Sequence, residues 1–207
     1  MLSYQHAYHA GNFADVHKHL TLYAVTDYLL RKKTPITYID THAGRGLYPL
    51  ATKETRRLQE YREGIWPLWQ KREQLTDALL GSWLNAIVGA QPDHNELTLY
   101  PGSPWWLSQP LREHDRLCLF ELHPGEHQHL NGQALPAQVK RVYGDGLAGL
   151  RAMLPVGHHQ MLLDVLQASG IRKIWRSELL LREPGEQAHG MFGSGMLVIN
   201  PPWGLDK

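Results

Sequence analysis

The fold is decided by the stretch Ile36-Thr37-Tyr38-Ile39-Asp40-Thr41-His42-Ala43-Gly44-Arg45-Gly46. An apolar, β-branched run that ends in an acid and opens into a Gly-x-Gly turn is typical of the first strand and loop of a Rossmann-type sheet, which bind a nucleotide-like ligand. The carboxylate of Asp40 beside this loop would repel a pyrophosphate and attract a cation. S-adenosylmethionine carries an amino group and a sulfonium, so the stretch predicts a site for this cofactor.

Composition sets broad limits on the class of protein. The chain has 207 residues, of which 43% are apolar, enough for one core, so we expect one domain over 1–207 with an insert. Lys and Arg number 21 against 20 Asp and Glu, and this net charge of +1 does not by itself indicate a nucleic-acid partner. Any basic surface must therefore come from local clustering.

Cysteine content and hydropathy predict the compartment. Cys118 is the single cysteine, which excludes an internal disulfide framework, and its apolar neighbours favour a buried thiol over a nucleophile. No apolar run approaches the roughly 20 residues that span a bilayer, and the first residues lack the basic flank of a signal peptide. We expect a cytoplasmic protein without a membrane partner.

Strand and helix patterns alternate along the chain. Asp15 is predicted to cap a helix that runs to about Arg31, and a helical insert over about 52–92 contains no strand pattern. The fold class is therefore α/β, a doubly wound Rossmann-like sheet with a small helical insert. The further elements expected are strands at 97–100, 116–120 and 138–142 and helices at 104–112 and 147–153.

The insert mixes arginines with Trp66, Trp69 and Trp83. Arginine contacts phosphate and exposed indoles stack on bases, so the insert is compatible with RNA binding. For each tryptophan we favour the alternative, a small private core, with nearby glutamates pairing with the arginines along the helices. The patch as a whole remains a candidate RNA surface.

Two further acids stand where strands are expected to end. Glu121 follows the run 117–120 and is placed to accept hydrogen bonds from ribose hydroxyls, while Asp145-Gly146 follows 138–142 and is placed at the adenine end of the cofactor. An acid after each of three strands favours a cofactor site over coincidence, although each acid alone is a weak signal.

Histidines raise the question of a metal. Five of them lie near the first helix and the glycine loop, but no pair shows the i, i+4 spacing with a companion acid that helical zinc motifs use. We therefore predict no metal. The five are His6, His9, His17, His19 and His42.

Short motifs throughout the chain resemble the ribosomal RNA large subunit methyltransferase J family. The resemblance covers nearly the whole chain, with the motifs in the family's order. It implies a class I methyltransferase that uses S-adenosylmethionine to methylate the N6 amine of an adenine in 23S ribosomal RNA. The matching motifs are Met1–Tyr4, His9–Asn12, Ala14–His19, Asp40–Gly44, Tyr100–Pro104, Glu121–Pro124, Ser169–Ile174 and Val198–Trp203.

The resemblance also assigns roles position by position. It places His19, His42 and Ser103 at the cofactor, where the strand-end acids Glu121 and Asp145 with Gly146 are expected from their position alone. It offers Tyr4 and Lys18 to the RNA.

The catalytic motif that the resemblance implies is absent from its expected place. Amine methyltransferases use Asp or Asn followed by Pro-Pro and an aromatic, whose oxygens accept from the amine while the ring stacks on the flipped base. Here the chain passes from Gln160 directly to Met161, which matches a later helix, so an internal segment near 160/161 is predicted to be missing, as is a C-terminal end. We favour a longer protein whose catalytic segment is not among these 207 residues over a true internal deletion, because loss of a central strand would expose two new sheet edges. Asp164 has helical spacing and is predicted to be an ordinary helix residue. Asn200, in Asn200-Pro201-Pro202-Trp203, is an alternative, although we favour a role in ending a late strand.

Three functions remain open from the sequence. The first is methylation of adenine in large-subunit ribosomal RNA, by a protein expected to be a monomer. The second is nucleic-acid binding by the same fold without activity. The third is a DNA-directed role in the use of external DNA, since nothing in the sequence senses a 2′-hydroxyl.

Overall fold

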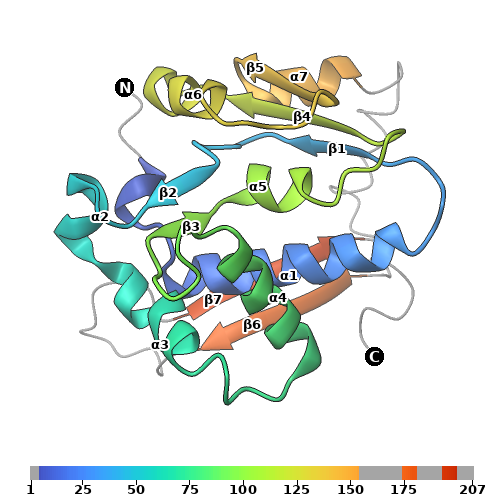
Figure 1. Cartoon of the computed structure of the whole chain (residues 1–207). Coiled ribbons are helices and arrows are strands. Elements are labelled where there is room, and N and C mark those ends of the chain that lie inside the picture. Colours follow the sequence, from blue (N-terminus) through green and yellow to red (C-terminus); the bar gives the residue numbers. More distant parts are fainter. Residues whose placement is uncertain (1–4, 154–173, 181–192, 200–207) are drawn as a thin grey trace, which may run out of the picture.

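The computed structural model describes residues 5–153, 174–180 and 193–199. Its main sheet has three parallel strands, β1 (Thr37–Asp40), β4 (Arg116–Glu121) and β5 (Val139–Tyr143), in the order β1-β4-β5 (Figure 1). Asp40 pairs in register with Leu119, and Glu121 pairs with Tyr143, so the acidic ends of β1 and β4 lie at the same edge of the sheet. This is the edge where nucleotide-type ligands bind in α/β sheets.

Helices cover this sheet. α5 (Ser103–Ser108) packs against β1 and β4, and α1 (Phe13–Leu30) packs against α5, while α6 (Pro124–Asn131) and α7 (Gly146–Met153) pack against β4. The core between sheet and helices is aliphatic. Its buried members are Ala43, Leu107, Leu117, Leu119, Leu130 and Val139.

The prediction for the start of α1 was wrong. Asn12, not Asp15, is the N-cap, and its side-chain oxygen accepts from the backbone N–H of Asp15 at 2.9 Å. Both residue types satisfy free N–H groups at a helix start, so sequence alone did not separate them. Asp15 is instead a buried carboxylate inside the first turn, which leaves it free to act elsewhere.

The helical insert is confirmed, but it is broken into short pieces. These are α2 (Lys53–Leu58), the 3-10 helix η2 (Glu60–Glu63), α3 (Ile65–Gln70) and α4 (Ala78–Gly89). Trp83 and Trp69 are buried in its core, and Trp83 stacks on Trp106 of α5 with ring centroids 5.7 Å apart. The expected burial is therefore confirmed for these residues, but the core is not private to the insert, because it is shared with α1 and α5.

A two-stranded antiparallel sheet flanks the insert. It joins β2 (Leu47–Pro49) to β3 (Leu99–Pro101). The strand expected at 97–100 as part of the doubly wound sheet is not in that sheet: it is β3, which pairs with β2 directly after the glycine loop. This pairing was not predicted, because β2 gave no clear strand signal in the sequence. The pairing of β3 with β2 places Gly102, the N-cap of α5, against Gly46 of the glycine loop.

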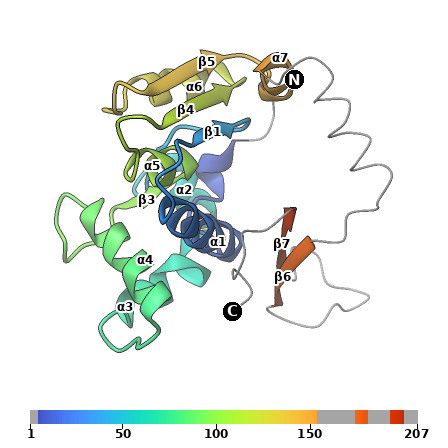
Figure 2. The ribbon, with the colours of Figure 1, turned by 90° about the vertical axis from the view of Figure 1, so that its right-hand side faces the viewer.

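A second antiparallel pair is formed by β6 (Ile174–Leu180) and β7 (Gly193–Ile199), of which β7 lies against α1, away from the main sheet (Figure 2). The late strand expected directly before Asn200 is thus confirmed as β7. Within the described residues, no helix is both long and apolar enough to cross a membrane.

Candidate cofactor site

The glycine loop depends on backbone conformations that glycine adopts freely. Gly44 has φ of 65° and Gly46 has φ of 86°, in the left-handed region. A Cβ atom on Gly44 would lie 2.1 Å from the hydroxyl oxygen of Tyr48. The loop therefore requires Gly44 for both its turn and its packing.

Contacts from distant residues anchor this loop. The N–H of Gly44 donates to Glu121 Oε2 at 2.7 Å, and the N–H of Gly102 donates to the carbonyl oxygen of Gly46 at 2.7 Å. Arg45 turns inward and forms a two-bond ion pair with Glu126 of α6, with Nε to Oε2 at 2.8 Å and only 8% and 6% of the two side chains exposed. The loop is thus held in shape before any ligand binds.

Asp40 ends β1 directly before the loop. Its Oδ1 accepts from the N–H of His42 at 3.1 Å, whereas its Oδ2 is buried and has no hydrogen-bond partner. Burial raises the pKa of this carboxyl group, and the nearby Ser103 hydroxyl, the His42 N–H and the charge of Lys18 offset that rise in part. A buried carboxylate oxygen without a donor is costly unless a partner arrives.

A second buried carboxylate, Asp15, lies in the adjacent helix. Its Oδ2 accepts from His6 Nε2 at 2.8 Å and from the N–H of Gly11 at 3.0 Å, and its Oδ1 accepts from Lys18 Nζ at 2.7 Å. Burial opposes ionisation, but the His6 hydrogen bond and the charges of His19, His6 and Lys18 hold the pKa of Asp15 far below its usual range. Asp15 thereby ties the N-terminal segment to α1.

His19 lies on the same helix as Asp15 and Lys18, whose charges act on it. It is 1% exposed, and its Nδ1 is 2.9 Å from the hydroxyl of Tyr100. Burial lowers the pKa of His19 to about 3, against the opposing charge of Asp15, so the ring is neutral at pH 7. In this conformation the His19 ring is buried and bonded to Tyr100, and direct contact with a cofactor stays a prediction.

The strand-end acids lie as the parallel register requires. Both oxygens of Glu121 accept backbone N–H groups, from Gly44 and from His123, the latter at 2.7 Å. Asp145 is exposed, and its Oδ1 caps α7 by accepting from the N–H of Leu147 at 2.8 Å. Gly146 lies against the loop so closely that a Cβ there would be 2.2 Å from the carbonyl oxygen of Thr41.

The structure therefore gathers most of the predicted site. His42 is exposed on the loop, with Nδ1 2.9 Å from Thr41 Oγ1, and Lys18 and Ser103 act on the charge of Asp40. Tyr4, Asp164 and Asn200 lie outside the described residues, as does the junction at 160/161. No cluster of metal-ligating side chains occurs among the residues that the structure describes.

Sequence reasoning missed the supports of the loop. Arg45 occupies the variable position of Gly-x-Gly, and nothing in the spacing pairs it with Glu126, far along the chain. Tyr48 was also missed, although its hydroxyl accepts from the N–H of Arg45 at 3.4 Å. The burial of Arg45 would have been the signal, but burial cannot be read from a sequence.

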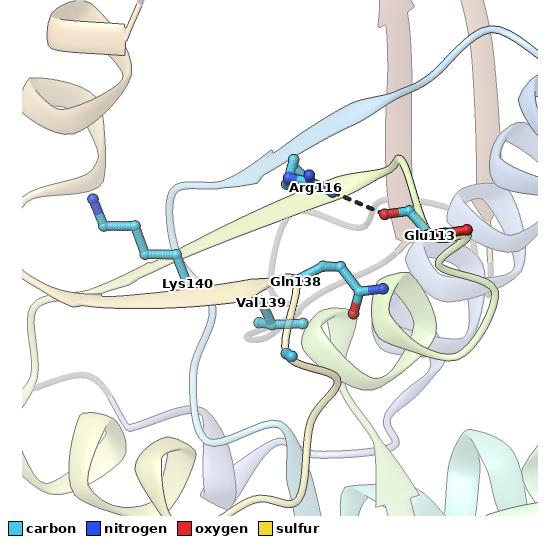
Figure 3. Close-up of a pocket in the computed structure, with 6 residues that line it drawn as sticks. Glu113, Arg116, Gln138, Val139 and Lys140 are labelled. Atoms are coloured by element: carbon cyan, nitrogen blue, oxygen red, sulfur yellow. Dashed lines mark hydrogen bonds between the residues drawn. The ribbon is translucent and has the colours of Figure 1, made fainter.

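Two cavities lie elsewhere. One, of about 520 Å³, is at the start of β4 and β5, at the opposite end of these strands from Glu121, and is lined by Glu113, Arg116, Ala137, Gln138, Val139 and Lys140 (Figure 3). Arg116 donates to the backbone oxygen of Glu113 there at 3.0 Å. The other, of about 290 Å³, lies among α1, α4 and α5, with Tyr23, Trp105 and Trp106 in its lining. Neither includes a predicted site residue.

Comparisons with known proteins agree with this arrangement. Residues 33–165 and 156–207 match the family described as ribosomal RNA large subunit methyltransferase D, RlmJ. The chain is 33% identical over 255 residues to ribosomal RNA large subunit methyltransferase J of Escherichia coli K12, covering 100% of this chain and 90% of that protein. It is 32% identical over 254 residues to the protein of the same name from Haemophilus influenzae, covering 100% and 89%. A crystal structure of a Legionella pneumophila protein superposes with a TM-score of 0.78 at 31% identity, over 94% of this chain and 88% of that one.

Proposed function

The chain belongs to the ribosomal RNA large subunit methyltransferase J family, and from this premise we propose that it uses S-adenosylmethionine to methylate the N6 amine of an adenine in 23S ribosomal RNA. The observation that carries the cofactor part is the buried, unpartnered Oδ2 of Asp40 beside a preformed glycine loop. A cationic ligand would give this oxygen the partner it lacks.

The residues of this site fit the groups of that cofactor. Asp40 and the exposed ring of His42 lie beside Ser103 and Lys18, in an environment suited to an amino acid moiety that carries both charges. Glu121 has lone pairs left after its two backbone contacts and would accept from ribose hydroxyls. Asp145 and Gly146 would face the adenine end, with Gly146 allowing close approach.

The reaction needs mainly positioning. When bound, the cofactor supplies a methyl group on a sulfonium, which is transferred in line to the amine. The loop anchors, Arg45 with Glu126 and Gly44 with Glu121, hold the cofactor side rigid so that little reorganisation is required. Tyr4 and Lys18 would contact the RNA.

A second candidate function is binding of cofactor and RNA without methylation, and it depends on whether the protein has an acceptor for the target amine. The alignment to the Escherichia coli relative extends over 255 residues, whereas the chain has 207, and the family match falls in two overlapping stretches. Both facts support the prediction that a segment near 160/161 has no counterpart here. If the protein itself lacks this segment, it would bind cofactor and RNA without methylating, unless Asn200 supplies the acceptor. If the segment belongs to the protein and is absent only from these 207 residues, methylation is expected.

One experiment separates these functions. The protein, with its intact mass measured first, is incubated with labelled S-adenosylmethionine and an unmodified 23S ribosomal RNA transcript, and the digested RNA is searched for N6-methyladenosine. We expect labelled N6-methyladenosine at one site, and its loss in Asn200→Ala if that residue is the acceptor. Cofactor and RNA binding without product would support the inactive alternative, and absence of both kinds of binding would overturn the proposal.

Three further measurements address the substrate, the oligomeric state and the location of the protein. A DNA strand of the same sequence tests the DNA-directed alternative, since faster methylation of DNA than of RNA would favour it. We also expect a monomer, which light scattering during size-exclusion chromatography would check. A cytoplasmic location stays a prediction that cell fractionation would test.

A further inference from the structure

We infer that α2 and η2 carry a surface that binds the phosphate backbone of RNA. This basic surface consists of Lys53, Arg56, Arg57 and Arg62. The inference rests on the proposed function, since it names the part of the protein that would hold the ribosomal RNA beside the cofactor site.

All four side chains of the basic surface are exposed, and none of them forms an ion pair with any carboxylate of the described residues. Lys53, Arg56 and Arg57 are spaced i, i+3 and i+4, so they share one face of α2. Arg62 adds a guanidinium 5.9 Å from the ring centre of Tyr61. By contrast, Arg45 and Arg112 are held in short ion pairs and serve the fold.

The acids of this stretch are directed elsewhere. Glu60 accepts from His9 Nδ1 and from Asn12 Nδ2, each at 3.0 Å, which joins it to the N-terminal segment. Glu54 is close enough to Arg45 and His129 for their charges to lower its pKa, after the larger effect of its own backbone N–H. Only Glu63 remains as an exposed acid beside the four cations. The surface is therefore locally basic although the chain carries a net charge of only +1.

The position of the surface fits RNA that reaches the cofactor site. The opposite side of α2 is fastened to the 3-10 helix η1 (His6–Tyr8) by the Thr55 hydroxyl, which donates to the carbonyl oxygen of Ala7 at 2.9 Å. η1 follows directly after the segment that holds Tyr4, the residue expected to contact RNA. Figure 1 shows η1, α2 and β2 on the side of the molecule where the carboxyl ends of β1 and β4 lie.

The observations favour RNA as the occupant. An unpaired cluster of three arginines and a lysine offers guanidinium forks that match phosphate geometry, and it needs no base-specific pocket to bind a backbone. Lys53 follows Gly46 closely in the sequence, so the two lie at most about 25 Å apart, within the reach of one RNA segment of several nucleotides. An acidic protein is the competing partner, and the test below distinguishes it.

The test compares two triple variants that remove the same charge. Arg56→Gln/Arg57→Gln/Arg62→Gln changes the basic surface, and Lys32→Gln/Lys33→Gln/Lys140→Gln removes three exposed lysines elsewhere. The affinity for an unmodified 23S ribosomal RNA fragment is measured by fluorescence anisotropy at several salt concentrations, and that for S-adenosylmethionine by calorimetry.

We expect the arginine variant to bind the RNA about 10- to 100-fold more weakly at 0.1 M salt, and its salt slope to fall by about 2 to 3, near one unit for each lost phosphate contact. The lysine variant should stay within about threefold of the native protein, and cofactor affinity should not change in either. Equal RNA affinity and equal slopes in the two variants would overturn the inference and point to an acidic protein partner. If the native protein binds cofactor but no RNA, the proposed function fails with it.

Discussion

Asp15 is a buried carboxylate, and Asp40 is half-buried with a buried Oδ2 atom. The charge of Lys18 acts on both, yet the two differ in the hydrogen bonds that they receive. Asp15 receives three hydrogen bonds, and its pKa is held far below the usual range. Asp40 receives one backbone donor, leaves Oδ2 unpartnered, and has a raised pKa. Lys18 donates a hydrogen bond to Asp15, whereas it acts on Asp40 only through its charge.

The difference separates structure from binding. A carboxylate with all its donors stabilises the fold and has little left for a ligand, as with Glu126 and its arginine. A buried carboxylate with an empty oxygen costs stability in the free protein and gains a partner on binding. Asp15 and Glu126 therefore belong to the framework, whereas Asp40 is the carboxylate that we propose for binding.

The largest expected effect is at the framework pair Arg45 and Glu126. Glu126→Gln should lower the free energy of unfolding by about 3 to 5 kcal/mol, because it leaves a buried arginine without its counter-charge. Urea denaturation measures this. The double variant Arg45→Met/Glu126→Leu should recover most of the loss, and an equally unstable double variant would contradict the interpretation.

Asp15→Asn tests the filled carboxylate. It should lower the free energy of unfolding by about 3 kcal/mol, because an amide has one accepting oxygen, whereas the present donors bond both oxygens of the carboxylate. The matched control is Asp27→Asn on the same helix, whose exposed pair with Arg31 contributes about 0.5 kcal/mol or less. If both variants unfold at the same urea concentration, Asp15 is not part of the framework.

Asp40→Asn tests the open carboxylate. The dissociation constant for S-adenosylmethionine should rise about 10- to 100-fold, the range expected for one charge-assisted hydrogen bond. The free energy of unfolding should stay the same or rise, because a buried charge with an unpartnered oxygen is removed. Calorimetry measures the affinity, with exposed Asp93→Asn as control; native affinity in the Asp40 variant would remove Asp40 from the site.

The smallest expected effect, counted per pH unit, is the change in the free energy of unfolding with pH that His19 causes. Its pKa is about 3 in the folded protein and near 6.5 in an unfolded chain, so the unfolded chain binds a proton first as pH falls. The free energy of unfolding should therefore decrease from pH 6.5 towards pH 3, by at most about 1.4 kcal/mol per unit from this group. Asp15, with its lowered pKa, adds a further loss only below about pH 4.

Two variants isolate the part of the pH slope that belongs to His19. His19→Gln should flatten the curve between pH 6.5 and pH 4, whereas replacement of exposed His114 by Gln should leave it unchanged. Denaturation at five or six pH values is sufficient. An unchanged slope in His19→Gln would show that this ring is not held neutral in the fold.

Much of the fold followed from local patterns. The strands β1, β4 and β5 and the glycine loop were predicted from an apolar run, an acid and two glycines, because strand ends and turns are specified by residues next to one another. The helix cap failed for the same reason: Asn12 and Asp15 are equally good local candidates. Only the structure separates them, because Asn12 accepts from the N–H of Asp15, whereas the Asp15 side chain accepts from His6, Gly11 and Lys18. The pairing of β2 with β3 joins segments on either side of the whole insert, and no local signal reports such a pairing.

The sequence by itself determined that the chain forms an α/β sheet with an acid and a glycine loop after its first strand, and its motifs determined the family. Only the tertiary structure decided which of the acids is satisfied and which is open. Asp15 and Glu126 are satisfied by donors that the fold brings to them, and the donor to Glu126 is Arg45 of the glycine loop, far away in the chain. Asp40 receives no such donor at Oδ2. Hydrogen-bond partners are set by packing between distant segments, so the empty oxygen at the proposed cofactor site became visible only in three dimensions.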